Sequence, residues 1–203
     1  MEDMEQDTSP SADEMSAAST APQSSRGSLA RFLLDVIETL VLAALLYLGI
    51  NAVTERIRVD GFSMEPTMHN GEFVLVNRLA YKLNPILLGD VIVFHFPIDP
   101  EQEYIKRVIG LPGDRVVIAN QEVIVNDSNL NEPYTAASPE YEGSWIVPAE
   151  HVFVLGDNRN NSSDSHTWGP VPMQNVVGKA LFVYWPITDL GLVRHVNPSL
   201  LGR

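Results

Sequence analysis

The first long hydrophobic stretch of the chain extends from Phe32 to Val53, and its second half has one clearly polar side chain, Asn51. As an α-helix this stretch is about 33 Å long, which matches a hydrocarbon core of about 30 Å. Asp35 and Glu38 lie on one face near its start, so an amphipathic helix on a soluble core is the alternative. Because the second half is apolar on every face, we expect a transmembrane anchor over residues 29–54.

Small residues do not occupy the places that would make this stretch a cleavable signal peptide. Cleavage needs small side chains one and three positions before the cut. A cut after Ala52 places Ile50 at the third position, and a cut after Gly49 places Tyr47 there. The stretch is therefore expected to remain as an anchor.

The segment before the anchor is polar and acidic. Residues 1–28 are rich in Asp, Glu, Ser, Ala, Thr, Gln and Pro, and they predict a disordered tail because such a segment buries too little apolar surface to fold. Arg26 and Arg31 precede the hydrophobic stretch 32–53, while Arg56 and Arg58 follow it. The positive-inside rule therefore gives a tie, and the charges leave the orientation open.

After residue 55 the hydrophobic positions form short stretches rich in β-branched and aromatic residues, separated by Gly, Pro, Asn and Asp. These stretches are residues 57–59, 73–76, 91–96, 115–118, 123–125, 152–155 and 180–185. They predict an all-β catalytic domain of packed, coiled antiparallel sheets over residues 55–203. The region 121–148 is more polar and richer in turns, as a small inserted subdomain would be.

Composition removes several classes of function. The chain has no cysteine, which excludes disulfides, cysteine nucleophiles and thiolate metal sites. Its formal net charge is -13, which argues against nucleic acid as a partner because phosphate binding needs a basic patch.

A serine and a lysine lie in surroundings that suit nucleophilic catalysis. Ser63 lies between a glycine and a proline in the turn Gly61–Met68, and Lys106 lies among the apolar residues of Tyr104–Ile109. A serine hydroxyl needs a base before it can attack, and burial favours the neutral form of a lysine. The neighbouring Arg107 cannot serve as the base because arginine stays protonated in proteins. The alternative is an ordinary turn and a lysine that reaches solvent.

A third motif follows these two, with the sequence Gly-Asp-Asn-Arg-Asn-Asn-Ser-Ser-Asp-Ser over Gly156–Ser165. In order, spacing and content, the three motifs resemble those of type I signal peptidases, and the resemblance extends from about Leu33 to the end of the chain. It implies a membrane-bound serine endopeptidase that removes signal peptides from exported preproteins without a cofactor. It also implies a single pass through the plasma membrane in contact with lipid, with a cytoplasmic tail and an extracytoplasmic catalytic domain.

The resemblance assigns roles to individual residues. Ser63 is the expected nucleophile, its N–H is one oxyanion-hole donor, and Lys106 is the expected general base. Ser162 matches a family serine whose hydroxyl hydrogen-bonds the lysine amine. Gly61 stands where some members carry a serine that supplies the second oxyanion donor, so a backbone group or water must take that role here. A preference for small substrate residues before the cut is implied in the same way.

The remaining polar residues of the third motif resemble a supporting ion-pair network. Asp157, Arg159 and Asp164 are its expected members. The family usually has an arginine where this chain has His166. An ion pair with His166 would hold only while the histidine is protonated, which makes this support sensitive to pH. A polar Asx-type turn is the alternative for this motif.

A metal site and a Ser-His-Asp site are alternative interpretations of these residues. Asp157, Asp164, His151 and His166 could be imagined as metal ligands, but no metal-binding motif is present and we expect no metal. A Ser-His-Asp arrangement would need a histidine near Ser63, and none of the remaining ones lies in a recognisable motif: His69, His95 and His195.

Hydrophobic residues also surround the nucleophile. They are either core residues or an apolar surface beside the site: Phe62, Met64, Met68 and Leu75. For the whole chain, a related processing protease with fewer substrates, a self-cleaving repressor-type protease and a non-catalytic membrane-tethered β-domain are the alternatives. The anchor argues against the repressor type, which would carry a DNA-binding module in its place.

Overall fold

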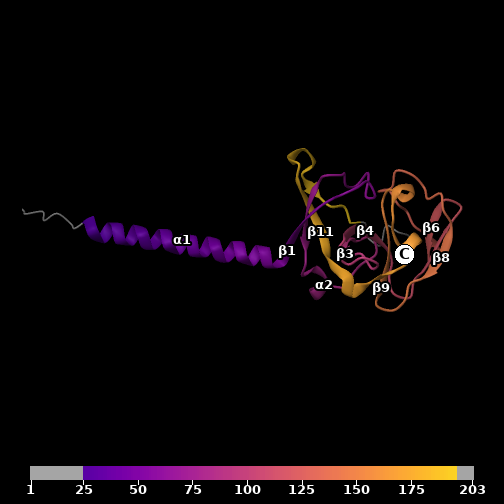
Figure 1. Ribbon diagram of the computed structural model, residues 1–203, viewed down its shortest axis with the longest axis horizontal. Coiled ribbons are helices and arrows are strands. Elements are labelled where there is room, and N and C mark those ends of the chain that lie inside the picture. The colour runs from indigo at the N-terminus through magenta and orange to yellow at the C-terminus, as the bar shows by residue number, and fades with distance from the viewer. Residues whose placement is uncertain (1–24, 196–203) are drawn as a thin grey trace, which may run out of the picture. The chain divides into compact units, whose positions relative to one another are not determined.

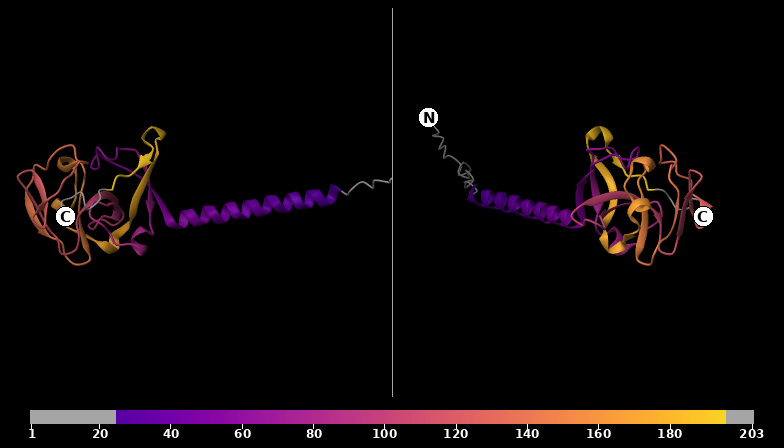
Figure 2. Two further views of the ribbon diagram at one scale, coloured as in Figure 1. Left: turned by 180° about the vertical axis from the view of Figure 1, so that it is seen from behind. Right: turned by 45° about the vertical axis from the view of Figure 1, so that its right-hand side comes forward.

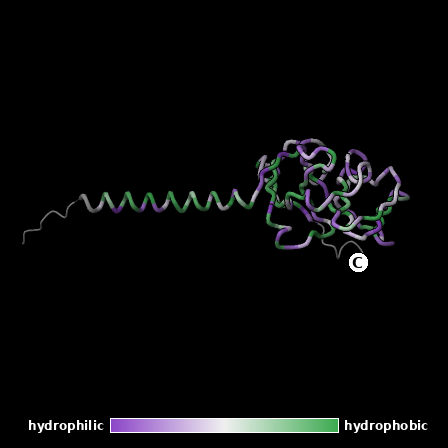
Figure 3. Tube along the Cα trace, turned by 60° about the horizontal axis from the view of Figure 1, so that its bottom comes forward, coloured by the Kyte–Doolittle hydropathy of each residue, from purple (hydrophilic) through white to green (hydrophobic). Residues whose placement is uncertain are grey.

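The computed structural model describes residues 25–195 (Figure 1). Helix α1 extends from Ser25 to Val53, so it begins four residues before the expected start of the anchor at residue 29. Residues 28–53 contain an 18-residue window with a mean hydropathy of 2.1 and are long and apolar enough to cross a membrane, and Figure 3 shows this helix as largely hydrophobic. The expected tail before residue 25 lies outside the described residues.

The rest of the described chain forms two antiparallel sheets and several short helices. The larger sheet contains β1 (Thr54–Arg58), β2 (Phe73–Asn77), β3 (Val91–His95), β4 (Glu103–Gly110), β9 (His151–Leu155), β10 (Val171–Pro172), β11 (Val176–Trp185) and β12 (Gly191–Leu192). Its strand order is β1-β2-β11-β3-β4-β9-β10, and β12 pairs with β11. Register shifts in β4 and β11 interrupt the ladder, and such bulges bend and twist a sheet.

The smaller sheet contains β5 (Arg115–Ala119), β6 (Glu122–Val125), β7 (Ser128–Asn129) and β8 (Gly143–Ile146), in the order β7-β6-β5-β8. Figures 1 and 2 place it at the opposite end of the domain from β1 and β11. It begins at residue 115, six positions before the expected insert, because β5 provides the central strand to which β6 and β8 pair.

Five short helical elements connect the strands: α2 (Ala80–Leu83), η1 (Arg159–Asn161), α3 (Ser165–Trp168), η2 (Met173–Asn175) and η3 (Ile187–Asp189). The fold class predicted from the sequence, a β domain of antiparallel sheets preceded by one apolar helix, is confirmed.

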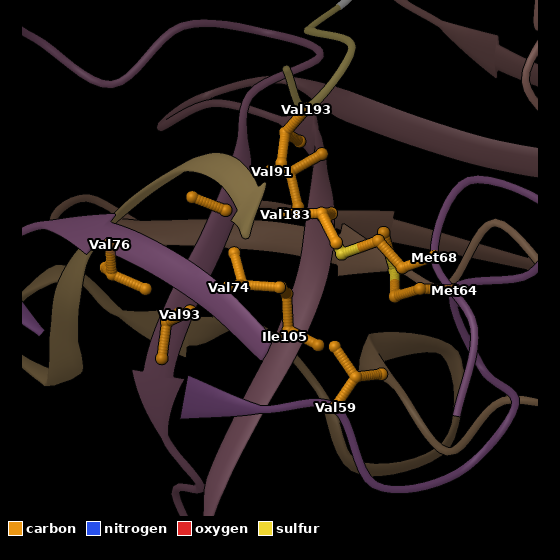
Figure 4. Close-up of a cluster of buried hydrophobic side chains, with 11 residues drawn as sticks. Val59, Met64, Met68, Val74, Val76, Val91, Val93, Ile105, Val183 and Val193 are labelled. Atoms are coloured by element: carbon orange, nitrogen blue, oxygen red, sulfur yellow. The ribbon is translucent and has the colours of Figure 1, made fainter. Parts of the chain in front are cut away.

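The core of the larger sheet reaches the turn that carries Ser63. Met64 and Met68 are fully buried and join a cluster with valines from β2, β3 and β11 (Figure 4). Val193, near the end of the described chain, belongs to the same cluster and lies beside Val91 and Val183 in the figure. The turn that carries Ser63 is thus anchored in the main core through Met64 and Met68.

Two strand edges of this sheet are left without a partner near the turn. Strand β4 pairs with β3 from Glu103 to Arg107, but its pairing with β9 begins only at Arg107. Strand β1 pairs with β2 on one side, and no other described strand is its neighbour. The edges of β1 and of residues 103–106 are therefore open to an extended chain.

Candidate active site

The Ser63 turn is fixed by its own backbone and by buried methionines. The N–H of Met68 donates to the carbonyl oxygen of Met64 at 2.9 Å, and the Glu65 N–H donates to the Phe62 carbonyl at 3.2 Å. Met64 and Met68 have no exposed surface, whereas Phe62 is 52% exposed. Of the two readings for these residues, the methionines are core and Phe62 is part of the surface beside the site.

The third motif holds the same turn from the other side. The Asn158 N–H donates to the Ser63 carbonyl at 3.0 Å, and the Asn158 side-chain amide donates to the Phe62 carbonyl at 3.0 Å. The hydroxyl of Thr67 donates to Asp157 at 2.5 Å. Two motifs that are about ninety residues apart in the sequence are therefore joined by three hydrogen bonds.

Lys106 and Ser63 are in direct contact. The lysine Nζ lies 2.7 Å from Ser63 Oγ and 3.0 Å from the carbonyl oxygen of Ile105. The lysine is 4% exposed, and burial lowers its pKa to about 8 although Asp164 and Asp157 act in the opposite direction. A substantial fraction of the amine is therefore neutral near pH 8, and only the neutral amine can accept the serine proton.

The backbone N–H groups around Ser63 are the candidate donors of an oxyanion hole. Within the described part of the chain, the Ser63 N–H donates to no acceptor, so it is available to an oxyanion. The Gly61 N–H already donates to Asn70 Oδ1 at 2.9 Å and is not available. Gly61 has a φ of 102°, a conformation that favours glycine over a residue with a side chain. The second donor must therefore come from elsewhere.

Ser162 lies close to the site without the bond that the family resemblance implies. Its hydroxyl is buried and has no hydrogen-bond partner among the described residues, and the lysine amine contacts Ser63 and Ile105 instead. The Ser162 hydroxyl and the Ser63 carbonyl oxygen both press against Gly156, where a Cβ atom would collide with each of them. Glycine at position 156 is thus required by the approach of these two serines.

Asp157 pairs with Arg107 instead of another member of the third motif. Arg107 Nε and Nη2 donate to the two carboxylate oxygens of Asp157 at 2.8 and 2.7 Å, and neither side chain is exposed. Arg107 Nη1 donates to the carbonyl oxygens of Gly89 and Arg194, both at 2.9 Å. This fork geometry uses the guanidinium fully, and it fixes β4 one residue after Lys106.

Arg159 and Asp164 also find separate partners. Arg159 donates to both carboxylate oxygens of Glu132 at 2.5 and 2.6 Å. Asp164 contacts His166 Nδ1 at 2.6 Å and accepts the Gly156 N–H at 2.9 Å. The expected network is therefore three separate ion pairs. Glu132 had no signal in the sequence, because it lies outside the motifs in the segment between β7 and β8.

His166 is held by three neighbours. Besides Asp164, it contacts the Thr167 hydroxyl through Nε2 at 3.0 Å and stacks on the Tyr141 ring with centroids 3.8 Å apart. A neutral histidine with the proton on Nδ1 can still donate to Asp164. The contact with Asp164 is therefore retained when the histidine is neutral, although the ion pair itself needs protonation as expected.

The dyad lies in a groove between the two open strand edges. The groove has a volume of about 470 Å³ and is lined by residues of β1, by residues 102–106, and by Ser63 and Ser163. Open edges facing one groove suit an extended peptide, whose backbone groups can hydrogen-bond to a strand edge. The groove therefore brings the backbone of a bound peptide to the Ser63 hydroxyl.

The alternative sites are not assembled in the part of the chain that the structure describes. No group of three His, Cys, Asp or Glu residues could hold a metal ion among the described residues. No histidine in residues 25–195 hydrogen-bonds Ser63. His195 accepts the Val91 N–H and contacts the Ala180 carbonyl, and burial lowers its pKa to about 4, so its role is to hold the end of the described chain.

Comparisons with known proteins match the chain to signal peptidases. The family described as "Signal peptidase, peptidase S26" matches residues 33–185. A "Signal peptidase I" of Leptolyngbya laminosa is 42% identical over 168 residues, covering 78% of this chain and 83% of the relative. A "Probable signal peptidase I-2" of Synechocystis is 40% identical, covering 79% of this chain and 77% of the relative. A crystal structure of a signal peptidase I from Enterococcus faecalis is 30% identical, with a TM-score of 0.44, covering 47% of this chain and 97% of that one.

Proposed function

The chain belongs to the signal peptidase family, peptidase S26, and we propose that it is a membrane-anchored serine endopeptidase that removes signal peptides from exported preproteins through Ser63 and Lys106. The observation that carries the assignment of residues is the 2.7 Å contact between the lysine Nζ and the serine Oγ. A non-catalytic binding domain would have no use for a buried lysine of lowered pKa against a serine hydroxyl.

In the first half of the reaction, the neutral Lys106 amine takes the proton of the Ser63 hydroxyl while Oγ attacks the carbonyl carbon of the scissile peptide bond. The resulting oxyanion accepts a hydrogen bond from the Ser63 N–H. The C–N bond then breaks as the lysine ammonium gives its proton to the leaving amine. An ester between Ser63 and the signal peptide remains.

In the second half, water attacks the ester carbonyl and Lys106 takes a proton from that water. The C–O bond to Ser63 breaks, the serine oxygen regains a proton from the lysine, and the signal peptide leaves with a new carboxylate. Ser162 would assist: its hydroxyl has no hydrogen-bond partner among the described residues, and its rotation toward the lysine amine would give that amine a third hydrogen bond, besides those with Ser63 and Ile105.

The setting of the enzyme follows from the family and from helix α1. The anchor makes membrane lipid a direct contact, and we place the chain in the plasma membrane with the tail in the cytoplasm and the catalytic domain outside. The family alone supports this orientation, because the charges do not decide it: two arginines precede the apolar stretch and two follow it. A processing protease with fewer substrates would use the same residues and differs only in the range of proteins cut.

Cleavage by the purified full-length protein tests the proposal. The protein in detergent micelles is incubated with a preprotein that carries a cleavable signal peptide, and the masses of both products are measured. We expect one cut at the signal-peptide junction and none with Ser63→Ala prepared in parallel. An unchanged preprotein mass with a folded wild-type enzyme would refute the activity.

A further inference from the structure

A second and larger cavity adjoins the groove that contains the dyad. Its volume is about 750 Å³, which is within the range of small-ligand sites, about 300–1,000 Å³. The two spaces share Glu103 of β4, and residues of β1 line both of them. The cavity is therefore a continuation of the β1–β4 groove away from Ser63. Nothing in the catalytic steps uses it.

Charged side chains from the strand ends line part of this cavity, beside apolar residues. Side chains two positions apart on a strand lie on one face. Four of the five Glu, Arg, Lys and His residues that line the cavity lie two positions from a member of the main core or a residue packed against it: Glu55 from Ile57, Arg78 from Val76, His95 from Val93 and Glu103 from Ile105. The fifth, Lys82, lies on α2. The apolar rows of the sheet thus end in polar residues at the cavity wall.

These charges are paired loosely and remain accessible. Arg78 and Glu55 lie 3.7 Å apart, and their side chains are 53% and 31% exposed. His95 and Glu103 lie 3.9 Å apart, with 46% and 28% exposed. Burial and the nearby Glu55 carboxylate raise the pKa of Glu103. Such pairs can exchange partners with polar groups of a ligand at little cost.

The cavity also lies at the end of the domain where the membrane helix joins it. Glu55, on its wall, follows the last helical residue, Val53, by two positions. The N–H of Arg78, also on the wall, donates to the Val53 carbonyl at 3.0 Å. A signal peptide has its apolar segment upstream of the cut, followed by a short stretch that ends at the cleavage site. The upstream part of a membrane-inserted substrate therefore approaches the groove from this end.

The spacing along β4 fixes which substrate residues reach the cavity. Glu103 lies three residues from Lys106, which is about 10 Å along a strand. We propose that the cavity is an upstream subsite of the peptidase, which binds the polar stretch of a signal peptide from about the fourth residue before the cut. This inference rests on the proposed function and names a part of the substrate that the dyad does not contact.

Two peptides of different length test the subsite. Both contain one cleavage sequence, with either three or nine residues before the cut, and both are cleaved by the full chain in detergent micelles. Gln174→Trp places a large ring on the cavity wall, since Gln174 is exposed there on η2. Lys82→Trp does the same from α2. Ser144→Trp is the control, because Ser144 is exposed on β8 and lines neither space.

We expect wild-type kcat/KM to be higher for the long peptide. Each cavity variant should lower kcat/KM for the long peptide at least about fivefold, mainly through KM, and leave the short peptide unchanged. Ser144→Trp should leave both unchanged. Equal wild-type kcat/KM for the two lengths, or equal losses for both peptides in both cavity variants, would overturn the subsite. Failure of a folded wild-type enzyme to cut either peptide would instead refute the proposed function.

Discussion

Arg107 and Asp157 form a bidentate ion pair with no exposed surface on either side chain, one residue along β4 from Lys106. The Asp157 carboxylate also accepts the Thr67 hydroxyl from the nucleophile turn. One buried pair therefore connects the strand that carries Lys106 to the turn that carries Ser63.

Removal of one partner should destabilise the whole domain. Asp157→Ala leaves the Arg107 guanidinium buried without its partner, and breaking such a pair costs about 3–5 kcal/mol. The free energy of unfolding in detergent, from denaturant titration, measures this effect. Asp127→Ala is the control, since Asp127 is 93% exposed and faces Arg115 at 3.9 Å. Equal stability of the Asp157→Ala protein and its control would contradict the assigned role.

The dyad itself should be intolerant of substitution. Ser63→Ala removes the nucleophile, and Lys106→Ala or Lys106→Arg removes a base that can be neutral. Each change should reduce kcat/KM by about a thousandfold or more while circular dichroism shows a folded protein. Lys179→Ala is a matched control, because Lys179 pairs with Asp90 away from the groove. Retention of substantial cleavage by a pure Lys106→Ala preparation would rule out the lysine as base.

The pH dependence of kcat/KM should report the pKa of Lys106. Burial lowers the pKa of Lys106 to about 8, and the free enzyme is active only with a neutral amine. Activity should therefore rise with pH on a limb centred near pH 8 and level off above it. A profile measured from pH 5 to 10 on a short peptide gives the midpoint. A midpoint near that of free lysine, about 10.4, would exclude a buried base.

The same lowered pKa predicts a stability difference with a definite sign. The unfolded chain binds a proton at Lys106 up to its ordinary pKa of 10.5, whereas the folded chain releases it near 8. Stability therefore rises with pH between these values, and the full penalty is present below about pH 8. Lys106→Met should be more stable than the parent below pH 8, with the gap closing toward pH 10.5. Unfolding titrations at pH 7 and 10 compare the two, and a gap that does not change would contradict the linkage.

Gly156 gives a steric prediction. A Cβ atom at this position would collide with the Ser63 carbonyl oxygen and with Ser162. Gly156→Ala should therefore displace the nucleophile turn and lower kcat by about tenfold or more. Gly191→Ala has its nearest neighbour at 3.8 Å and should be silent. Cleavage rates of the two variants on one peptide make the comparison, and equal rates would show that the turn tolerates the methyl group.

The parts of this molecule that were predictable from sequence are local. The apolar anchor, the strand pattern, and the serine and lysine motifs each depend on residues close together in the chain. The position of Lys106 opposite Ser63 was implied only by resemblance, and the structure places them in contact. The catalytic residues that lie within a single motif could therefore be predicted from the sequence alone.

Partners that depend on long-range packing were not predictable. Glu132 is 27 positions from Arg159 and has no motif around it, so its pairing follows from how the segment after β7 returns to the larger sheet. The bond expected between Ser162 and the lysine is absent among the described hydrogen bonds, in which the amine contacts the Ser63 hydroxyl and the Ile105 carbonyl. Sequence patterns named the charged residues but could not assign their partners.

The contact of Arg107 with the Arg194 carbonyl, together with Val193 in the core beside Met64 and Met68, ties the segment after β12 to the site. This segment lines none of the groove around Ser63, yet it supplies a core side chain under the serine turn and an acceptor for the guanidinium next to Lys106. It therefore acts as a strap across the base of the site, and a change in this strap reaches Ser63 and Lys106 without touching either of them.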